Sequence, residues 1–187
     1  MQNKAKDSEC KIWISDIGNV EDWELELSTD ASLGNLCEGV GSTGAKVVLL
    51  VNRVTGRCAP INWQCNKIVR VVDSTLSAEC LSLKDGLNDA IYSRQVLEEI
   101  LGLKTKSIPI RALVDNKGTV EAVHSTTNVA DKKLRRDVAT IKQMMNEGEV
   151  ASIKWCSGKE QIADCMTKRG AAPWSLMEVF KTGKRWS

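Results

Sequence analysis

Residues 25–32 of the chain read Leu25-Glu26-Leu27-Ser28-Thr29-Asp30-Ala31-Ser32. Apolar and polar residues alternate along this stretch, and a period of two residues is typical of a β-strand. Asp30 comes where the alternation ends, so the strand is expected to present a carboxylate at the rim of a sheet. A strand that ends in aspartate is common, because aspartate also starts turns, and this stretch alone does not establish a site.

Three further acids lie in apolar surroundings that a carboxylate normally avoids. They are Glu79 within Thr75-Leu76-Ser77-Ala78-Glu79-Cys80, Asp115 within Ile110-Arg111-Ala112-Leu113-Val114-Asp115-Asn116, and Asp164 within Gln161-Ile162-Ala163-Asp164-Cys165-Met166-Thr167-Lys168. Four acids suit Mg²⁺, which prefers hard oxygen ligands. They suit neither zinc nor a Ser-His-Asp triad, for which the single His124 would have to serve.

Taken together, these segments resemble the ribonuclease H domain of retroelement reverse transcriptases, most closely that of copia-like retrotransposons. The resemblance covers about residues 23 to 183. It rests on Ser28-Thr29-Asp30-Ala31-Ser32, Ile61-Asn62-Trp63, Asp73-Ser74-Thr75-Leu76-Ser77-Ala78-Glu79, Val114-Asp115-Asn116 and Gln161-Ile162-Ala163-Asp164-Cys165-Met166-Thr167-Lys168. Each stretch is weak alone, but together they follow the order found in the family.

The resemblance implies an endoribonuclease that cleaves the RNA strand of RNA/DNA hybrids during reverse transcription. It implies two Mg²⁺ ions, with Mn²⁺ as an alternative, bound by Asp30, Glu79, Asp115 and Asp164, with Asp30 bridging the ions. Two such ions about 4 Å apart activate the attacking water and hold the leaving oxygen. It also implies a polymerase domain of the same polyprotein as a partner, and an intracellular location within retroelement particles.

The order of the expected elements predicts an α/β chain with a mixed five-stranded sheet. Strands are expected at 25–32, 45–52 and 57–63 as an antiparallel meander, and at 108–114 and 150–155 after helical crossovers. Helices are expected at about 75–91, 93–101, 117–124, 131–146 and 161–169, and the polar, glycine-rich stretch 34–44 is interpreted as a loop. This order matches the ribonuclease H fold.

Composition and charge indicate how the chain is divided. We interpret residues 1–22 as a linker or the end of a preceding polymerase or connection region, and residues 23–187 as one ribonuclease H domain with a short basic tail from 173. The net charge of the chain is +2, but it is unevenly distributed. The first 29 residues carry three lysines and seven acids, a net charge of −4, so the remainder carries +6. A moderately basic body suits a polyanionic partner.

The chain shows no signal for secretion or for a membrane. Its amino terminus is polar, and the longest aliphatic run, Val47 to Val51, is too short to span a bilayer. The seven cysteines are odd in number and contain no CxxC pair, which indicates a reducing compartment. We expect Cys80 and Cys165 to be buried packing residues on helices, and Trp63 to lie in the core.

Selection of a hybrid requires contacts with 2′-hydroxyl groups on one strand. Ser32, Ser77 and Asn116 each lie within two residues of a proposed ligand and are candidates for such contacts, although these residue types also cap helices. The segment from Asp131 carries basic residues that either hold phosphates or form a solvated helix face. These are Lys132, Lys133, Arg135 and Arg136.

Two features depart from the family pattern. The loop Ser157-Gly158-Lys159-Glu160 lacks the His that many ribonucleases H carry before the last acidic helix, and His124 is expected to be structural. The span from Asp115 to Asp164 has no room for the basic, Trp-containing insertion of bacterial enzymes. Slow turnover and weak hybrid affinity in isolation are therefore expected. Two alternatives stay open: a DNA-cleaving integrase or resolvase-type nuclease, and an inactive domain that scaffolds a polymerase.

Overall fold

A computed structural model describes residues 14, 16–36, 41–127, 129–168 and 170–185. Its centre is a five-stranded sheet with the strand order β3-β2-β1-β4-β5. The strands are β1 (Trp23–Leu36), β2 (Gly41–Asn52), β3 (Cys58–Ile68), β4 (Ile110–Val114) and β5 (Ser152–Trp155). The first three pair antiparallel, whereas β4 pairs parallel with both β1 and β5. The mixed sheet predicted from the order of elements is confirmed.

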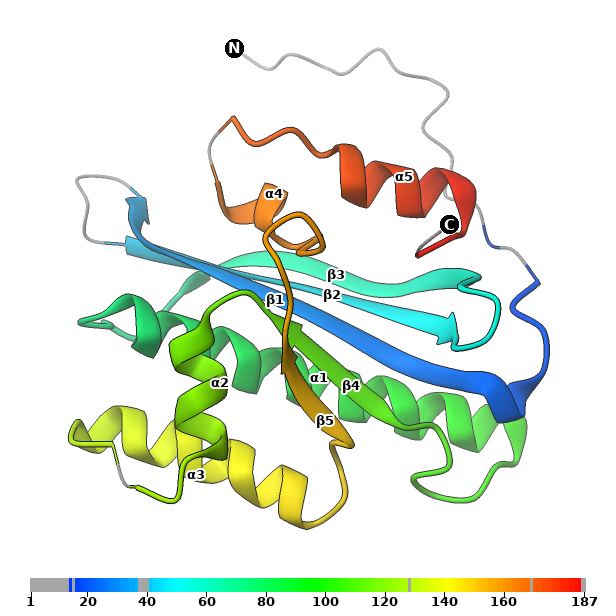
Figure 1. Ribbon diagram of the computed structural model, residues 1–187, viewed down its shortest axis with the longest axis horizontal. Coiled ribbons are helices and arrows are strands. Elements are labelled where there is room, and N and C mark those ends of the chain that lie inside the picture. Colours follow the sequence, from blue (N-terminus) through cyan, green and yellow to red (C-terminus); the bar gives the residue numbers. More distant parts are fainter. Residues whose placement is uncertain (1–13, 15, 37–40, 128, 169, 186–187) are drawn as a thin grey trace.

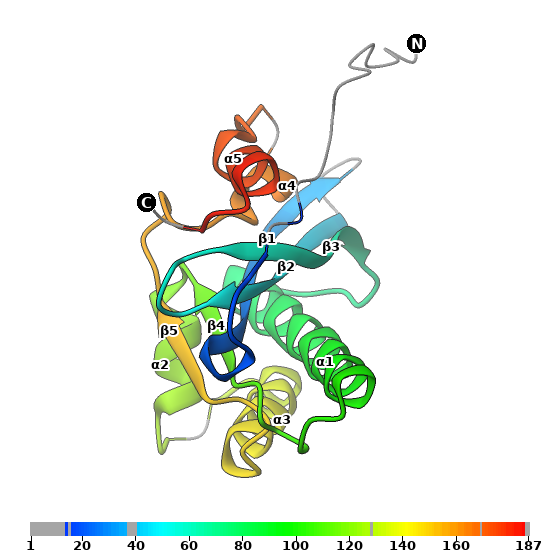
Figure 2. The same cartoon turned by 90° about the vertical axis from the view of Figure 1, so that its right-hand side faces the viewer.

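Helices cover both faces of this sheet. The helical elements are η1 (Val20–Asp22), α1 (Thr75–Leu101), α2 (Lys117–His124), α3 (Lys132–Asn146), α4 (Asp164–Thr167) and α5 (Trp174–Thr182). Figures 1 and 2 show α1, α2 and α3 on one face and α4 and α5 on the other. The chain therefore forms three layers with the sheet in the middle.

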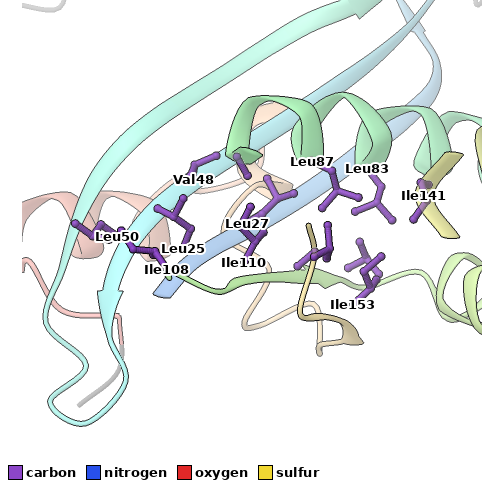
Figure 3. Close-up of a cluster of buried hydrophobic side chains, with 14 of the residues drawn as sticks. Leu25, Leu27, Val48, Leu50, Leu83, Leu87, Ile108, Ile110, Ile141 and Ile153 are labelled. Carbon is purple, nitrogen blue, oxygen red and sulfur yellow. The ribbon is translucent and has the colours of Figure 1, made fainter. Parts of the chain in front are cut away.

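The main hydrophobic core lies between the sheet and α1, where alternate residues of the strands point (Figure 3). Its members include Leu25, Leu27, Val48, Leu50, Leu83, Leu87, Ile108, Ile110, Ile141 and Ile153. A second cluster on the other face joins Val47, Leu49 and Val51 to residues of α5. Both faces of β2 are thus buried, which explains its uninterrupted aliphatic run.

Helix α1 is one continuous helix of 27 residues, whereas the sequence predicted two helices divided near residue 92. The polar residues at the expected break have partners within and outside the helix. Ser93 Oγ donates to Asp89 O at 2.7 Å, and the buried Arg94 side chain pairs with Glu149. The helix begins after Ser74, whose Oγ accepts from Ser77 N, and ends at Gly102 with a φ of 63°, as its sequence predicts.

The expected loop at 34–44 is largely strand, because β1 continues to Leu36 and β2 begins at Gly41. Residues 37–40 lie outside the described residues. The expected helix at 161–169 is shorter and consists of α4 alone, and Arg169 also lies outside the described residues. Likewise, residues 1–13, the greater part of the expected linker, are not described.

The segment expected as a basic tail forms helix α5. Leu176, Val179 and Phe180 of this helix are buried in the second cluster. After the helix, Cys58 N donates to Gly183 O at 2.7 Å and Arg185 N donates to Gly56 O at 2.8 Å. These bonds satisfy backbone groups at the start of the edge strand β3.

Trp63 is not a core residue, because its side chain lies on the edge strand and stays 40% exposed. It packs edge-on against Phe180 of α5, with ring centroids 5.0 Å apart. Cys80 is fully buried beside Leu134 and Val138, as expected, and Cys165 is partly buried against the second cluster. Among the described helices, none combines the length and hydrophobicity needed to cross a bilayer.

Candidate metal centre

Three of the four predicted acids meet at one end of the parallel pair β1 and β4. Asp30, Glu79 and Asp115 each offer one carboxylate oxygen, and these three oxygens lie within 4.8 Å of one another. The ladder between β1 and β4 ends at the pair Ser28 and Leu113. Asp30 and Asp115 therefore both stand just beyond the last rung, where the two strands part.

Helix α1 brings Glu79 to this place because it packs closely against β1. A Cβ atom at Gly86 would lie 2.7 Å from Thr29 Cγ2, so only glycine allows this separation of helix and strand. Ser82 Oγ donates to Asp30 O at 3.1 Å and ties α1 to the strand beside the carboxylate. Glu79 thus lies about one helical turn before Ser82, the residue that is hydrogen-bonded to Asp30.

Asp164 lies beside this group of three rather than within it. Its negative charge acts on Asp30 and Asp115, but its carboxylate is paired with Nζ of Lys168, the residue that follows the last turn of α4. Thr167, between them, donates its hydroxyl to Asp30 Oδ2. Helix α4 and its C-cap residue therefore supply one acid, one cation and one hydrogen bond to the same site.

The chemistry of the donor set fits a hard divalent cation. Asp30 is 2% exposed and Glu79 is 3% exposed, and Glu79 Oε2 accepts no hydrogen bond from any described residue. A buried carboxylate oxygen without a donor is costly unless a cation neutralises it. Three oxygen donors with no imidazole or thiolate among them suit Mg²⁺ or Mn²⁺ and do not suit zinc.

Solved structures share this arrangement of strands and helices. The N-terminal RNase H domain of Rv2228c from Mycobacterium tuberculosis matches with a TM-score of 0.50 and 16% identity, over 86% of this chain and 97% of that one. LC11-RNase H1, isolated from compost, matches with a TM-score of 0.54 and 15% identity, over 76% of this chain and 91% of that one. This chain has a ribonuclease H fold. No protein-family model and no curated protein matches the sequence.

Within this ribonuclease H fold, burial changes the acidity of the clustered groups. Burial raises the pKa of Glu79 to about 8, and the charges of Asp30 and Asp115 add to the rise. Burial likewise raises the pKa of Asp30 to about 6, although the Thr167 hydrogen bond opposes it. The pKa of Asp115 is also raised by burial and by Asp164. The folded chain therefore resists full ionisation of this cluster.

These shifts predict an unusual pH dependence of stability for the metal-free protein. Glu79 and Asp30 hold their protons to a higher pH when folded than in the unfolded chain, where carboxyl groups titrate near pH 4. Their contribution to the free energy of unfolding is therefore most favourable below about pH 4 and falls as the pH rises to about 8. We expect thermal denaturation in EDTA to show a lower melting temperature at pH 8 than at pH 5.

The matched control for this titration is Glu79→Gln, which removes the carboxyl group with the highest pKa of the cluster. Acids whose pKa is lowered, such as Asp137, lose their contribution only at more acid pH and leave this window unaffected. The variant should show a flatter profile between pH 5 and 8. Equal slopes in the variant and the wild type would contradict the assignment.

The residues proposed for RNA contacts have local structural roles, and their contacts with RNA stay predictions. Ser77 is buried in the cap of α1, and Asn116 Oδ1 accepts from Thr119 N at 3.0 Å as the N-cap of α2. Ser32 is half-buried on β1. The basic residues Lys132, Lys133, Arg135 and Arg136 are exposed at the start of α3, where Arg135 donates to two backbone carbonyls. They form no part of the acidic cluster.

Other side chains at the acidic cluster had no role assigned from the sequence. Thr167 and Lys168 follow Asp164 at helical spacings of three and four, so their common face was readable. Gln161 begins the same stretch, but no spacing in the sequence indicated what its side chain contacts. His124 is structural as expected, because its Nε2 lies 3.0 Å from Ile153 O and joins α2 to β5.

Proposed function

We propose that the chain is a metal-dependent endoribonuclease that cleaves the RNA strand of RNA/DNA hybrids. One observation carries the proposal: three carboxylates from β1, α1 and the end of β4 converge within 4.8 Å. One of them has a buried oxygen with no donor among the described residues. The ribonuclease H fold supports the same class of reaction. In addition, clustered carboxylates repel one another, so their grouping where β1 and β4 part is costly unless a cation binds there.

Asp30, Glu79, Asp115 and Asp164 would hold two Mg²⁺ ions, or Mn²⁺ in their place. Bound there, divalent ions lower the pKa of an attacking water and stabilise the leaving oxygen. Thr167 fixes the orientation of the Asp30 carboxylate through its hydroxyl. Asp164, whose carboxylate pairs with Lys168, would be a further ligand, and the Lys168 ammonium would be placed near a substrate phosphate.

The substrate and the biological setting are further parts of the proposal. Ser32, Ser77 and Asn116 would contact the 2′-hydroxyl side of the hybrid, and Lys133, Arg135 and Arg136 would hold phosphates. The Gln161 to Lys168 motif supports a copia-like retrotransposon origin. In that setting the domain at 23–187 would act beside the polymerase domain of the same polyprotein, within retroelement particles inside the cell.

The proposal is tested by incubating the full chain with end-labelled RNA/DNA hybrid, duplex RNA and duplex DNA, each with Mg²⁺ or with EDTA. We expect cleavage of the RNA strand of the hybrid alone, and only with Mg²⁺. Cleavage of duplex DNA would point to an integrase or resolvase type of nuclease instead. No cleavage of any substrate, with Mg²⁺ or with Mn²⁺, would favour a scaffolding domain and overturn the proposal.

A further inference from the structure

Gln161 lies between β5 and α4 and is only 3% exposed. Its Nε2 atom donates to Thr29 O at 2.9 Å and to Leu113 O at 3.3 Å. Its Oε1 atom accepts from Ala163 N at 3.3 Å. One side chain therefore contacts the main chain of β1, of β4 and of the segment that enters α4.

Each of these contacts lies next to a proposed metal ligand. Thr29 precedes Asp30, Leu113 comes two residues before Asp115, and Ala163 precedes Asp164. The strand ladder between β1 and β4 ends at Leu113, so the amide group spans the place where the two strands part. The Gln161 amide continues the cross-strand bonding there and sets how far apart the strands stand.

The chemistry of the contacts requires a primary amide of this length. Two carbonyl oxygens face its two N–H bonds, and one backbone N–H faces its oxygen, which uses the donors and the acceptor of the group together. Methionine has a similar length but would leave two buried carbonyls without this donor. Asparagine keeps the amide but is shorter by one methylene.

We infer that Gln161 is a positioning residue for the carboxylate cluster, holding Asp30, Asp115 and Asp164 at the separations that a divalent cation needs. The inference rests on the proposed function, because it assumes that the cluster binds such a cation. Residues that orient ligands without touching the metal typically change affinity or activity by about 10-fold to 100-fold when replaced. Gln161 is expected to act in this range.

Asn52 offers a matched control within the same chain. It is 2% exposed, its Nδ2 donates to Ile17 O at 2.9 Å, and its Oδ1 accepts from Val54 N and Thr55 N. Asn52 pairs with Trp23, seven residues before Asp30 along β1, which is about 23 Å at the usual rise of a strand. Asn52→Leu therefore removes an equally bonded buried amide far from the cluster.

The experiment compares wild type, Gln161→Met and Asn52→Leu as full chains, by calorimetric titration with Mn²⁺ and by steady-state cleavage of hybrid, at a temperature where each is folded. Both variants should melt at lower temperature. Only Gln161→Met should weaken Mn²⁺ binding, by about 10-fold or more, and lower kcat with KM for the hybrid unchanged. Gln161→Asn should give a smaller loss of affinity, and it decides the question if Gln161→Met does not fold.

Two results would overturn the inference, and they are distinguishable. A wild-type chain that binds Mn²⁺ while the position 161 variants bind it equally well would show that Gln161 only stabilises the fold. A wild-type chain that binds no Mn²⁺ would overturn the proposed function, and this inference with it.

Discussion

Asp30→Asn is expected to abolish Mg²⁺-dependent cleavage of hybrid and, at the same time, to make the metal-free protein more stable. A cation at such a site contributes several kcal/mol to the transition state, which corresponds to about a thousandfold in rate. The gain in stability follows from burial, which raises the pKa of Asp30 to about 6. At pH 8 the folded chain must ionise this group against that shift, at about 1.4 kcal/mol per pKa unit.

The control is Asp137→Asn, the same chemical change at another buried aspartate. Asp137 on α3 is 3% exposed, accepts from Lys84 Nζ at 2.7 Å and also pairs with Arg70. Burial works against its ionised form, but the hydrogen bonds from Arg70 and Lys84 prevail and lower its pKa. The two cations left behind, Arg70 and Lys84, are 34% and 22% exposed, so we expect a cost below the about 3–5 kcal/mol of a fully buried pair. Asp137→Asn should therefore destabilise the fold while the remaining folded protein still cleaves.

Thermal denaturation at pH 8, in EDTA and in saturating Mg²⁺, measures both effects. In EDTA the melting temperature should rise for Asp30→Asn and fall for Asp137→Asn. Mg²⁺ should raise the melting temperature of the wild type and of Asp137→Asn but have little effect on Asp30→Asn, because ligand binding to the folded state is what produces the shift. Retained cleavage in Asp30→Asn, or a fall in its metal-free stability, would contradict the assignment of this carboxylate.

The mixed sheet and the buried faces of its strands and helices could be predicted from the sequence, because local patterns indicate them. The alternation at 25–32 places Leu25 and Leu27 in the core and leaves Asp30 on the opposite face, as observed. Helix α1 buries Leu83 and Leu87 at the helical spacing that the sequence shows. In both elements, the periodicity of the apolar residues determined which face is buried.

The two largest errors in the predicted elements have different physical causes. The break expected within α1 is absent because Arg94 is buried and ion-paired with Glu149, 55 residues away in sequence. No local pattern encodes such a contact. Helix α5, in contrast, was readable from Leu176, Val179 and Phe180 at spacings of three and four, but the charges of the segment favoured a solvated tail.

In the candidate site, too, some features could be predicted from the sequence and others could not. The resemblance to a known family implied that four acids meet, and the oxygens of three of them, Asp30, Glu79 and Asp115, lie within 4.8 Å of one another. The bonds from Thr167 to Asp30 and from Gln161 to Thr29 cross 137 and 132 residues of sequence. Long-range polar contacts of this kind depend on the complete fold, so the periodicity of the sequence does not predict them.

Gly86→Ala is expected to destabilise the protein, although the same change in an exposed helix stabilises it by up to about 1 kcal/mol. The added Cβ would lie 2.7 Å from Thr29 Cγ2 and 3.0 Å from Leu27 Cδ1, both on fully buried side chains of β1. Thr29 is branched at Cβ, and its carbonyl is bonded to Gln161, so it has little freedom to move. Overpacking of this kind typically costs about 1–3 kcal/mol.

The consequence for the site is a longer distance between helix and strand, because α1 must move away from β1 to admit the methyl group. Glu79 lies seven residues before Gly86 on α1, and Thr29 adjoins Asp30, so the displacement separates two proposed ligands. Gly86→Ala should lower the melting temperature by several degrees and weaken Mn²⁺ binding. The control is Asn88→Ala, an exposed position on the same helix, which should leave both unchanged or slightly raise the melting temperature. A Gly86→Ala protein as stable as Asn88→Ala, with wild-type affinity for Mn²⁺, would mean that this contact does not set the position of Glu79.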